Sequence, residues 1–488
     1  MKFKTTLIVF GIFAALLAAF LIFEAAGTRK EGTRDKLVTF SGEDVERMLF
    51  KTGGETLTFV KGDGGDWKIT SPIEARGDKY EIDRLAGDFA DLKYDRIVEE
   101  EAADLEKYGL PDKEITLFIK DAPQPVQIEI GMENPLDNSF FARRADSNKV
   151  VLISSFFKSI LENTLFDFRD KEIFRFESDD VSSVTLKSQN GEWRSVKQED
   201  EWWLESPVKS LAVKSRITGL LTSLSGLKAK EFMSEAKTED DLETFGLSNP
   251  DYAVTLDLPA ANQTLIFIFN EAEDSQADTT AEIKSVTEAP ASLGETLSYV
   301  TSSLSDKIIA VENTIFTDLK GDPDEWREKK VADFYSWETN GLRIKTETMD
   351  LSLVKNDESV WFREGREDDT FDRDKVDDLI RGIQNLNADG FIDPPLALPE
   401  LGLDKPKAEI TIRTGSGDTA GEYVFLFGRE DKEPGTVVVK NKRLDYVFRV
   451  KSEILEKIPA SAEDLKPEET EEIKEGKPDD KKDDTTKK

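Results

Sequence analysis

The feature that most constrains this fold is an internal repeat framed by three tryptophans, Trp67, Trp202 and Trp361. At 15, 18, 22 and 25 residues after each tryptophan, all three copies have an apolar residue. These positions are Ile82, Leu85, Phe89 and Leu92, then Ile217, Leu220, Leu224 and Leu227, then Val376, Leu379, Ile383 and Leu386. Steps of three, four and three residues place the side chains on one face of a helix. The pattern predicts one building block repeated in tandem, each copy with a helix facing a core.

A second landmark lies further along each copy. Glycine followed by leucine recurs 42, 44 and 41 residues after the tryptophan, at Gly109, Gly246 and Gly402. Glycine tolerates positive φ, so we expect a left-handed residue that ends a turn. Between helix and glycine, 30 residues after each tryptophan, a short extended segment is predicted around Ile97, Phe232 and Phe391.

Strand-like segments surround the helix. Apolar residues alternate before the first and third tryptophans and after each Gly-Leu pair, which is typical of half-buried strands. The tryptophan strand stops at Pro72 in the first copy and at Pro207 in the second. A shorter closing helix is expected at 155–161 and at 452–458. The predicted fold class is α+β: an N-terminal transmembrane helix, three tandem repeats of mainly antiparallel sheet plus helix, and a disordered acidic tail.

The repeat also sets the predicted domain boundaries. The three repeat units are expected at 37–171, 172–330 and 331–460. Within the second unit, the acidic, Ser/Thr-rich stretch 270–290 predicts a long loop. The segment 461–488 is highly charged and has no apolar period, so it cannot bury enough surface to offset the entropy of ordering. We expect it to be disordered.

The N-terminal segment predicts a membrane anchor. Residues 5–23 are 19 residues without a charge, and a helix of that length spans about 28 Å, close to the ~30 Å hydrocarbon core. The apolar region of a cleaved signal peptide is shorter, typically ~7–15 residues. A cleaved signal and a buried soluble helix remain the alternatives.

The orientation of this anchor follows from its position. Only Lys2 and Lys4 precede it, whereas Arg29, Lys30, Arg34 and Lys36 follow it, and by the positive-inside rule this count opposes an exported body. A very short N-terminal tail before a single span nevertheless behaves like an export signal, and long domains translocate largely regardless of charge. We therefore expect a single-pass protein of the inner membrane, with its N-terminus cytoplasmic and its body periplasmic.

Composition excludes several functions. The net charge of −34 repels nucleic acid, so none is expected as a partner. The chain has no cysteine and no histidine, which removes disulfides, thiolate nucleophiles, the Ser-His-Asp triad and the commonest metal ligand. Catalysis would have to rely on carboxylates, lysine, tyrosine or serine.

Short motifs in the sequence do not define a site. Residues 155–158 fit S-x-x-K and residues 51–53 fit K-T-G, but their order is reversed relative to penicillin-binding enzymes and S-D-N is missing. The glycines at 415, 417 and 421 precede a strand, whereas a phosphate-cradling loop precedes a helix. Asp318, Asp322 and Asp324 miss the spacing of a calcium loop. We predict no catalytic, cofactor-binding or metal-binding residues and no cofactor.

The tryptophans allow two interpretations. Their identical place in every unit favours packing over sugar stacking. Trp203 and Trp326 fall outside the pattern and are the candidates for surface contacts. Two further hypotheses are a hydrolase of cell-envelope polymers that uses paired carboxylates and a module that binds divalent cations through its acidic excess.

The blocks "WKITSPIEARGDKYEIDRLAGDFADLKYDRIVEE…LEKYGLP" and "WWLESPVKSLAVKSRITGLLTSLSGLKAKEF…LETFGLSNP" resemble the bacterial domain-of-unknown-function 4340 family. The W-x-[IL]-x-S-P strand end, the helix and the Y/F-G-L turn carry the resemblance, which covers nearly all of 37–460. The third copy is similar but has no S-P after its tryptophan strand. The resemblance implies a protein anchored by one N-terminal helix and encoded beside an ATP-binding-cassette (ABC) transporter similar to the system linked to gliding motility.

The expected function is therefore that of a non-catalytic accessory or scaffold protein, not an enzyme. The lipid bilayer is the predicted partner of the N-terminal segment. Membrane subunits of an ABC-type transporter are the partners that the resemblance implies. A carboxylate-dependent hydrolase is the alternative.

Overall fold

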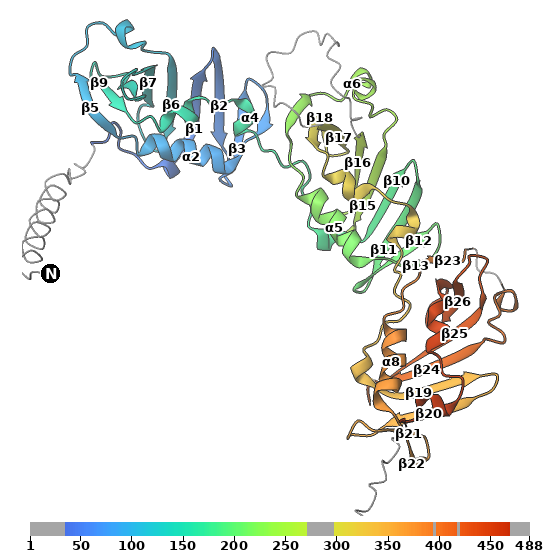
Figure 1. Ribbon diagram of the computed structural model, residues 1–488. Helices are drawn as coiled ribbons and strands as arrows, with labels where there is room; N and C mark the ends of the chain where they lie inside the picture. The colour runs from blue at the N-terminus through green and yellow to red at the C-terminus, as the bar shows by residue number, and fades with distance from the viewer. Residues whose placement is uncertain (1–34, 271–296, 394–396, 417–419, 469–488) are drawn as a thin grey trace, which may run out of the picture. The chain divides into compact units, whose positions relative to one another are not determined.

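A computed structural model describes residues 35–270, 297–393, 397–416 and 420–468 (Figure 1). The chain divides into two compact units, one ending at Glu172 and one beginning at Ile173. The first unit contains one large sheet and the second contains two. We call these sheets, with the helices that cover them, the first, second and third repeats.

The first repeat forms a single antiparallel sheet of nine strands. Its strands are β1 (Val45–Thr52), β2 (Glu55–Lys61), β3 (Trp67–Ser71), β4 (Ala75–Arg76), β5 (Tyr94–Glu99), β6 (Lys113–Ile119), β7 (Val126–Glu133), β8 (Phe140–Arg144) and β9 (Val150–Ile153). Its helices are η1 (Gly42–Asp44), α2 (Lys79–Ala90), η2 (Glu106–Tyr108), α3 (Phe157–Leu161) and α4 (Leu165–Phe168). The spatial order of the strands is β4-β3-β2-β1-β6-β7-β8-β9-β5.

The second repeat has the equivalent elements. Its strands are β10 (Ser183–Ser188), β11 (Gly191–Gln198), β12 (Glu201–Ser206), β13 (Ser210–Leu211), β14 (Glu231–Ser234), β15 (Tyr252–Leu258), β16 (Gln263–Asn270), β17 (Leu297–Ser302) and β18 (Ser305–Glu312). Its helices are η3 (Ser178–Asp180), α5 (Lys214–Ser225), α6 (Glu239–Thr244), η4 (Pro259–Ala261), α7 (Ile315–Leu319) and η5 (Pro323–Trp326). The order β13-β12-β11-β10-β15-β16-β17-β18-β14 is that of the first sheet.

The third repeat repeats this order a third time, as β22-β21-β20-β19-β24-β25-β26-β27-β23. Its strands are β19 (Thr339–Thr346), β20 (Asp350–Lys355), β21 (Trp361–Arg363), β22 (Arg366–Phe371), β23 (Gly390–Phe391), β24 (Ala408–Thr414), β25 (Gly421–Glu430), β26 (Thr436–Asn441) and β27 (Phe448–Lys451). Its helices are η6 (Ser336–Glu338), α8 (Arg373–Gln384), η7 (Leu398–Leu401), η9 (Ser452–Lys457) and η10 (Ala462–Leu465).

The long helix of each repeat links opposite edges of its sheet. In the first repeat, α2 follows β4 at one edge and precedes β5 at the other, so the helix has to cross one face of the sheet (Figure 1). All twelve positions of the predicted apolar stripe are buried. So are Trp67, Trp202 and Trp361, which lie in the cores beneath these helices. Burial of one indole and one helix face therefore organises each repeat.

The Gly-Leu turns have the predicted conformation. Gly109, Gly246 and Gly402 have φ values of 65°, 71° and 68°. At Gly402 a Cβ atom would lie 2.9 Å from the backbone nitrogen of Arg429, so both the conformation and the close approach require glycine.

The predicted fold class is wrong. The described residues form mostly antiparallel sheet, in three sheets of nine strands each, with few helices. The closing helices also differ from those expected. Helix α3 has only five residues, and η9 is a 3₁₀ helix of six residues. Strands of two residues, such as β4 and β13, are too short to show alternation in a sequence.

The expected transmembrane helix is part of this correction. Across the described ranges, no helix is long and apolar enough to cross a membrane. The long helices have 12 residues each and alternate buried with exposed faces. The segment 5–23 lies outside the described residues.

The predicted tail of 461–488 begins too early. Leu465 in η10 is buried in the core of the third repeat, so ordered structure continues past residue 460. A single leucine among charged residues has no periodicity to reveal it. Residues 469–488 lie outside the described part, as does most of the predicted loop 270–290.

Helix α8 offers a test of how its first turn is stabilised. The Oδ1 atom of Asp372 accepts hydrogen bonds from the backbone N–H groups of Asp374 (2.9 Å) and Lys375 (3.1 Å). We expect Asp372→Ala to cost about 1 kcal/mol, the usual value of such a cap. Hydrogen exchange of the α8 amides should become about fivefold faster. Asp372→Asn keeps an acceptor oxygen and should lose less stability. Equal exchange rates of the α8 amides in wild type and Asp372→Ala would contradict the cap.

Candidate functional site

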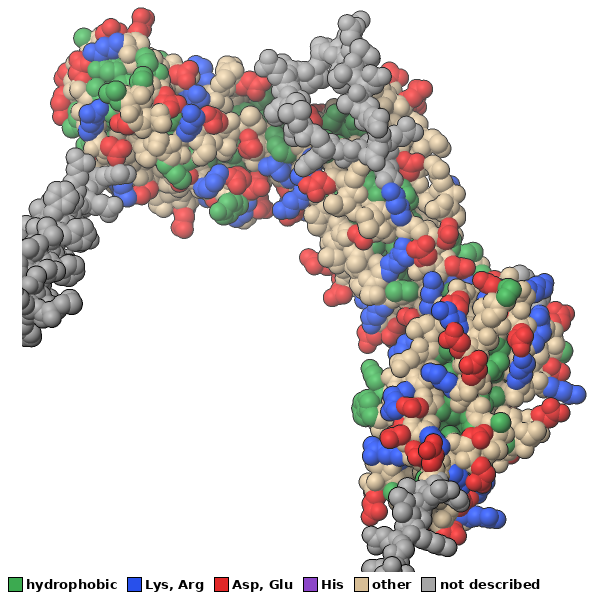
Figure 2. Space-filling view, in the orientation of Figure 1, with side chains coloured by type: hydrophobic (Ala, Val, Ile, Leu, Met, Phe, Trp, Pro, Cys, Tyr) green, Lys and Arg blue, Asp and Glu red, His purple; other side chains and the backbone are tan. Residues whose placement is uncertain are grey.

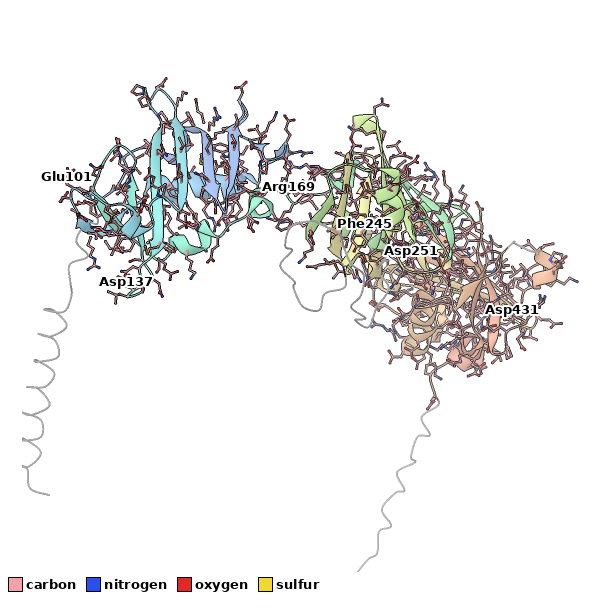
Figure 3. All side chains as sticks on the ribbon, turned by 90° about the horizontal axis from the view of Figure 1, so that it is seen from above. Glu101, Asp137, Arg169, Phe245, Asp251 and Asp431 are labelled. Atoms are coloured by element: carbon pink, nitrogen blue, oxygen red, sulfur yellow. The ribbon has the colours of Figure 1, made fainter. Side chains whose placement is uncertain are left out.

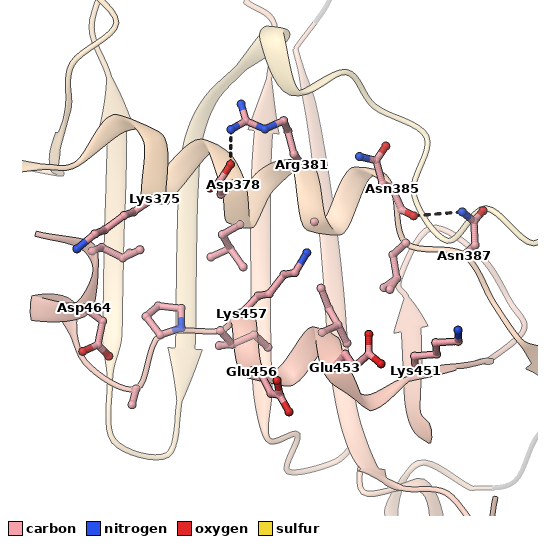
Figure 4. A pocket seen from close by; sticks show the side chains of 18 of the residues that line it. Lys375, Asp378, Arg381, Asn385, Asn387, Lys451, Glu453, Glu456, Lys457 and Asp464 are labelled. Atoms are coloured by element: carbon pink, nitrogen blue, oxygen red, sulfur yellow. Dashed lines mark hydrogen bonds and ion pairs between the residues drawn. The ribbon is translucent and has the colours of Figure 1, made fainter. Parts of the chain in front are cut away.

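A large groove lies in the third repeat, between α8 and the closing segment formed by η9 and η10 (Figure 4). Its volume is about 1130 Å³. Gly382 lies on the α8 side, and a Cβ atom there would be 3.2 Å from Cδ of Lys457. The lack of a side chain at Gly382 leaves room for Lys457 to lie against the helix.

Charges of both signs line this groove. The cations are Lys375, Arg381, Lys451 and Lys457, and the carboxylates are Asp378, Asp389, Glu453, Glu456 and Asp464. Asp378 forms an ion pair with Arg381 (Figure 4), and this hydrogen bond raises the pKa of the Arg381 guanidinium. A guanidinium that stays charged cannot exchange protons as a general acid or base. The groove is suited to polar recognition.

The second repeat has a smaller groove at the equivalent place. Its volume is about 430 Å³. Ser223 occupies the position of Gly382, and its hydroxyl donates a 2.5 Å hydrogen bond to Asp318 on α7. This bond links the helix to the closing segment across the groove. The second and third repeats therefore share a groove at this place, and the residue 21 positions after the tryptophan lies beside it.

In the first repeat that position is Asp88 on α2. Its Oδ2 atom is buried and has no hydrogen-bond partner among the described residues. Burial raises the pKa of the Asp88 carboxyl, although the nearby Arg84 lowers it. Burial disfavours the charged form of Asp88 and Arg84 offsets this only in part, so the ionised carboxylate destabilises the first repeat.

The lysines of the two short motifs set aside in the sequence form ion pairs. Lys158 of the S-x-x-K match forms an ion pair with Glu133 (3.2 Å), and Lys51 of K-T-G forms one with Glu114 (3.0 Å). Gly415 follows strand β24 and has a φ of 64°, strand β25 begins at Gly421, and residue 417 lies outside the described ranges.

The three aspartates near the end of the second repeat have separate roles. Asp318 accepts from Ser223, Asp322 precedes the 3₁₀ helix η5, and Asp324 pairs with Arg327 (3.0 Å). In the part of the chain that the structure describes, no group of three or more Asp, Glu, His or Cys residues could hold a metal ion.

The interpretation of Trp326 as a surface residue is wrong. Trp326 is fully buried, and its ring centroid lies 4.4 Å from that of Trp193. It fills the place that Phe168 has in the first repeat and Leu465 in the third, since all three carbonyls accept a hydrogen bond at the start of the long helix. The distance from the tryptophan strand differs between repeats, so a fixed offset could not reveal this equivalence. Trp203 is half-buried.

The residue after Trp326 joins the second and third repeats. Arg327 is buried, with a side-chain exposure of 2%, and its guanidinium forms an ion pair with Asp393 beyond β23. It also donates to Ser210 Oγ of β13 (3.2 Å) and lies over the ring of Phe391 at 3.6 Å. We call this set of contacts the Arg327 junction. Sequence reasoning missed it.

A further hydrogen bond joins the two repeats at the junction. The Leu211 N–H of β13 donates to the hydroxyl of Tyr446, 3.4 Å away. Burial raises the pKa of Tyr446 to about 12, so this hydroxyl stays neutral. In the first repeat, Arg169 has the position of Arg327, after Phe168 (Figure 3). The available signal was an aromatic residue followed by arginine at the end of both repeats.

These features define a class: a protein built from tandem nine-stranded antiparallel sheets, each crossed by one helix. The family "Domain of unknown function (DUF4340)" matches residues 67–250 and 202–397. The two matches overlap, together cover more than half of the 488 residues, and begin at the tryptophans of the first and second repeats. The chain belongs to this family. No curated protein and no solved structure matches it.

The Asp88 carboxyl predicts an unusual pH dependence. Because its pKa is raised in the folded state, the native chain binds this proton more tightly than the unfolded chain, and stability falls as pH rises past the ordinary value. We expect Asp88→Asn to stabilise the first repeat at pH 7, with the gain vanishing near pH 3. Thermal unfolding measured across that range tests this.

Asp91 provides a control of opposite sign. Hydrogen bonds from Lys36 and Lys93 lower the pKa of Asp91 to about 2. Its contribution is therefore present above the ordinary pKa and is lost as pH falls toward 2. Asp91→Asn should not stabilise at pH 7. An Asp88→Asn variant that is less stable than wild type at pH 7 would show that the carboxylate has a favourable partner.

The Arg327 junction predicts unequal effects for its two carboxylates. Asp393→Ala leaves a buried guanidinium without its main partner and should cost about 3 kcal/mol. Asp324→Ala removes an exposed partner of the same guanidinium and should cost less than about 1 kcal/mol. The measurement is the urea dependence of hydrogen exchange in β19 and β24. Equal effects would mean that the guanidinium does not depend on Asp393.

Proposed function

We propose that this protein is a non-catalytic scaffold that presents a repeated sheet surface to protein partners, as an accessory of an ABC-type transport complex. The observation that carries the proposal is the Arg327 junction. A buried ion pair contributes little net stability compared with apolar residues of the same size. Its geometry does fix orientation, because the guanidinium is held by Asp393, Ser210 and Asp324 at once. Such fixation suits a scaffold.

The chemistry of the side chains supports a binding role. The chain has no histidine or cysteine, and the Arg381 cation of the main groove is held by a carboxylate. On the face drawn in Figure 2, basic and acidic side chains are interspersed on all three repeats. A mixed polar surface of this kind resembles the rim of protein–protein interfaces.

The partner and the location rest on the sequence alone. The ABC-type transporter subunits come from the resemblance to the family. A location at the inner membrane, with the repeats on the periplasmic side, rests on the apolar stretch 5–23, which lies outside the described residues. Both are part of the proposal.

Co-purification tests this function. We expect a tagged full-length chain, isolated from detergent-solubilised membranes of its own host, to retain membrane subunits of a transporter after washing at moderate salt. Asp393→Ala, which loosens the junction, should retain at least about threefold less, whereas Asp324→Ala should retain the wild-type amount. The absence of transporter subunits from the wild-type sample would overturn the scaffold proposal, and recovery of the chain from the soluble fraction would overturn the location.

A further inference from the structure

The third repeat exposes a pair of aromatic rings that its fold does not require. Tyr335 and Trp337 are 55% and 73% exposed. Their ring centroids lie 5.5 Å apart with an interplanar angle of 26°, so the rings stack on each other. Both flank Ser336, where η6 begins. We call these two rings the aromatic pair.

Comparison between the repeats separates this pair from the fold. The 3₁₀ helices η1, η3 and η6 occupy the same place before the first central strand of each sheet. Ser41 and Glu177 correspond to Tyr335, and Glu43 and Asp179 correspond to Trp337. Since polar residues serve at these positions in two repeats with the same sheet order, core packing does not explain the aromatic residues of the third.

The backbone under the aromatic pair is fixed. The Ser336 N–H donates to Oε1 of Gln384 in α8 (2.9 Å), and the Glu338 carbonyl accepts from the Gly415 N–H (3.0 Å). A ligand would therefore meet rings whose backbone is already ordered, which lowers the entropy cost of binding. Tyrosine and tryptophan on an ordered support are the residues that most often anchor protein interfaces.

The charge around the pair selects the chemistry of the partner. Asp333 pairs with Lys330 (3.2 Å) and is 93% exposed, and the exposed Glu338 side chain has no hydrogen-bond or ion-pair partner among the described residues. The carboxylates flank rings whose faces attract cations. The net charge of −34 would also steer a basic partner toward the chain.

We propose that the aromatic pair docks an arginine-bearing segment of a protein partner, with the guanidinium over Trp337 and within reach of Glu338. The inference rests on the proposed scaffold function and names the contact through which a partner would be held. Asn385, which lines the groove of the third repeat, follows Gln384 directly. The partner's arginine-bearing segment therefore has a path from the aromatic pair along α8.

A peptide titration tests the site without knowledge of the partner. The full-length chain is labelled with 5-fluorotryptophan, and the resonance of Trp337 is identified by its loss in Trp337→Asp. The probes are the capped peptide Gly-Arg-Gly-Arg-Gly and its citrulline counterpart, which has the same shape without the charge. We expect a saturable shift of the Trp337 resonance with the arginine peptide and at least about threefold weaker binding of the citrulline peptide.

Matched variants define the control. Trp337→Asp and Tyr335→Glu introduce the residues that the second repeat has at these positions, so the fold should tolerate them. Tyr335→Glu should shift the apparent Kd of the arginine peptide by at least about twofold. Tyr80→Ser removes an isolated tyrosine that is 73% exposed in the first repeat and should change nothing.

The outcomes are distinct. No shift, equal binding of both peptides, or a shift with the neutral trisaccharide maltotriose alone would each overturn the inference, the last in favour of a glycan site. Co-purification separates this result from the scaffold function. If Trp337→Asp retains the transporter subunits as well as wild type does, the proposed role of the aromatic pair is wrong and the scaffold proposal is unaffected. If wild type retains none, the scaffold fails while the titration still decides the site.

Discussion

The buried guanidinium of Arg327 is the interaction on which the unit from residue 173 onward depends. It has partners in both repeats, with Ser210 and Asp324 in the second and Asp393 and Phe391 in the third. Each repeat has its own core, and Leu211 of β13 in the second repeat also packs against the core of the third. What the junction adds is a fixed geometry, because the third repeat cannot turn away without breaking the contacts of the guanidinium with Asp393 and Phe391.

Inside each repeat, a different constraint applies. A nine-stranded sheet exposes a wide apolar face, and the 12-residue helix that links its two edges covers this face together with the shorter closing helices. In the first and third repeats, the indole below the helix donates a hydrogen bond to an aspartate on it, from Trp67 to Asp83 (2.7 Å) and from Trp361 to Asp377 (3.0 Å). The second repeat has Thr218 at this position and instead buries the Trp193–Trp326 pair. The same strand order therefore forms with different side-chain contacts below the long helix.

The sequence predicts the parts of this fold that depend on local periodicity. The helix stripe and the left-handed glycines are such parts, since each reflects a rule about neighbouring residues. The continuity of the nine-stranded sheets was not predictable, because strands such as β13 and β23 have two residues and owe their pairing to distant partners. The Arg327 junction was missed for a similar reason: its partners lie 66 and 117 residues away in sequence. That the fold does not require the aromatic pair became clear only when the equivalent 3₁₀ helices η1, η3 and η6 could be compared in the structure.

We propose that the second and third repeats act as one rigid scaffold. The chain has no cysteine, so spin labels can be attached at single introduced cysteines, one at Ser215 on α5 and one at Asp374 on α8. Pulsed electron–electron double resonance then measures the distribution of distances between the two spin labels, one in each repeat. We predict one narrow distribution in wild type that broadens in Asp393→Ala. A broad distribution in the wild-type chain would contradict it.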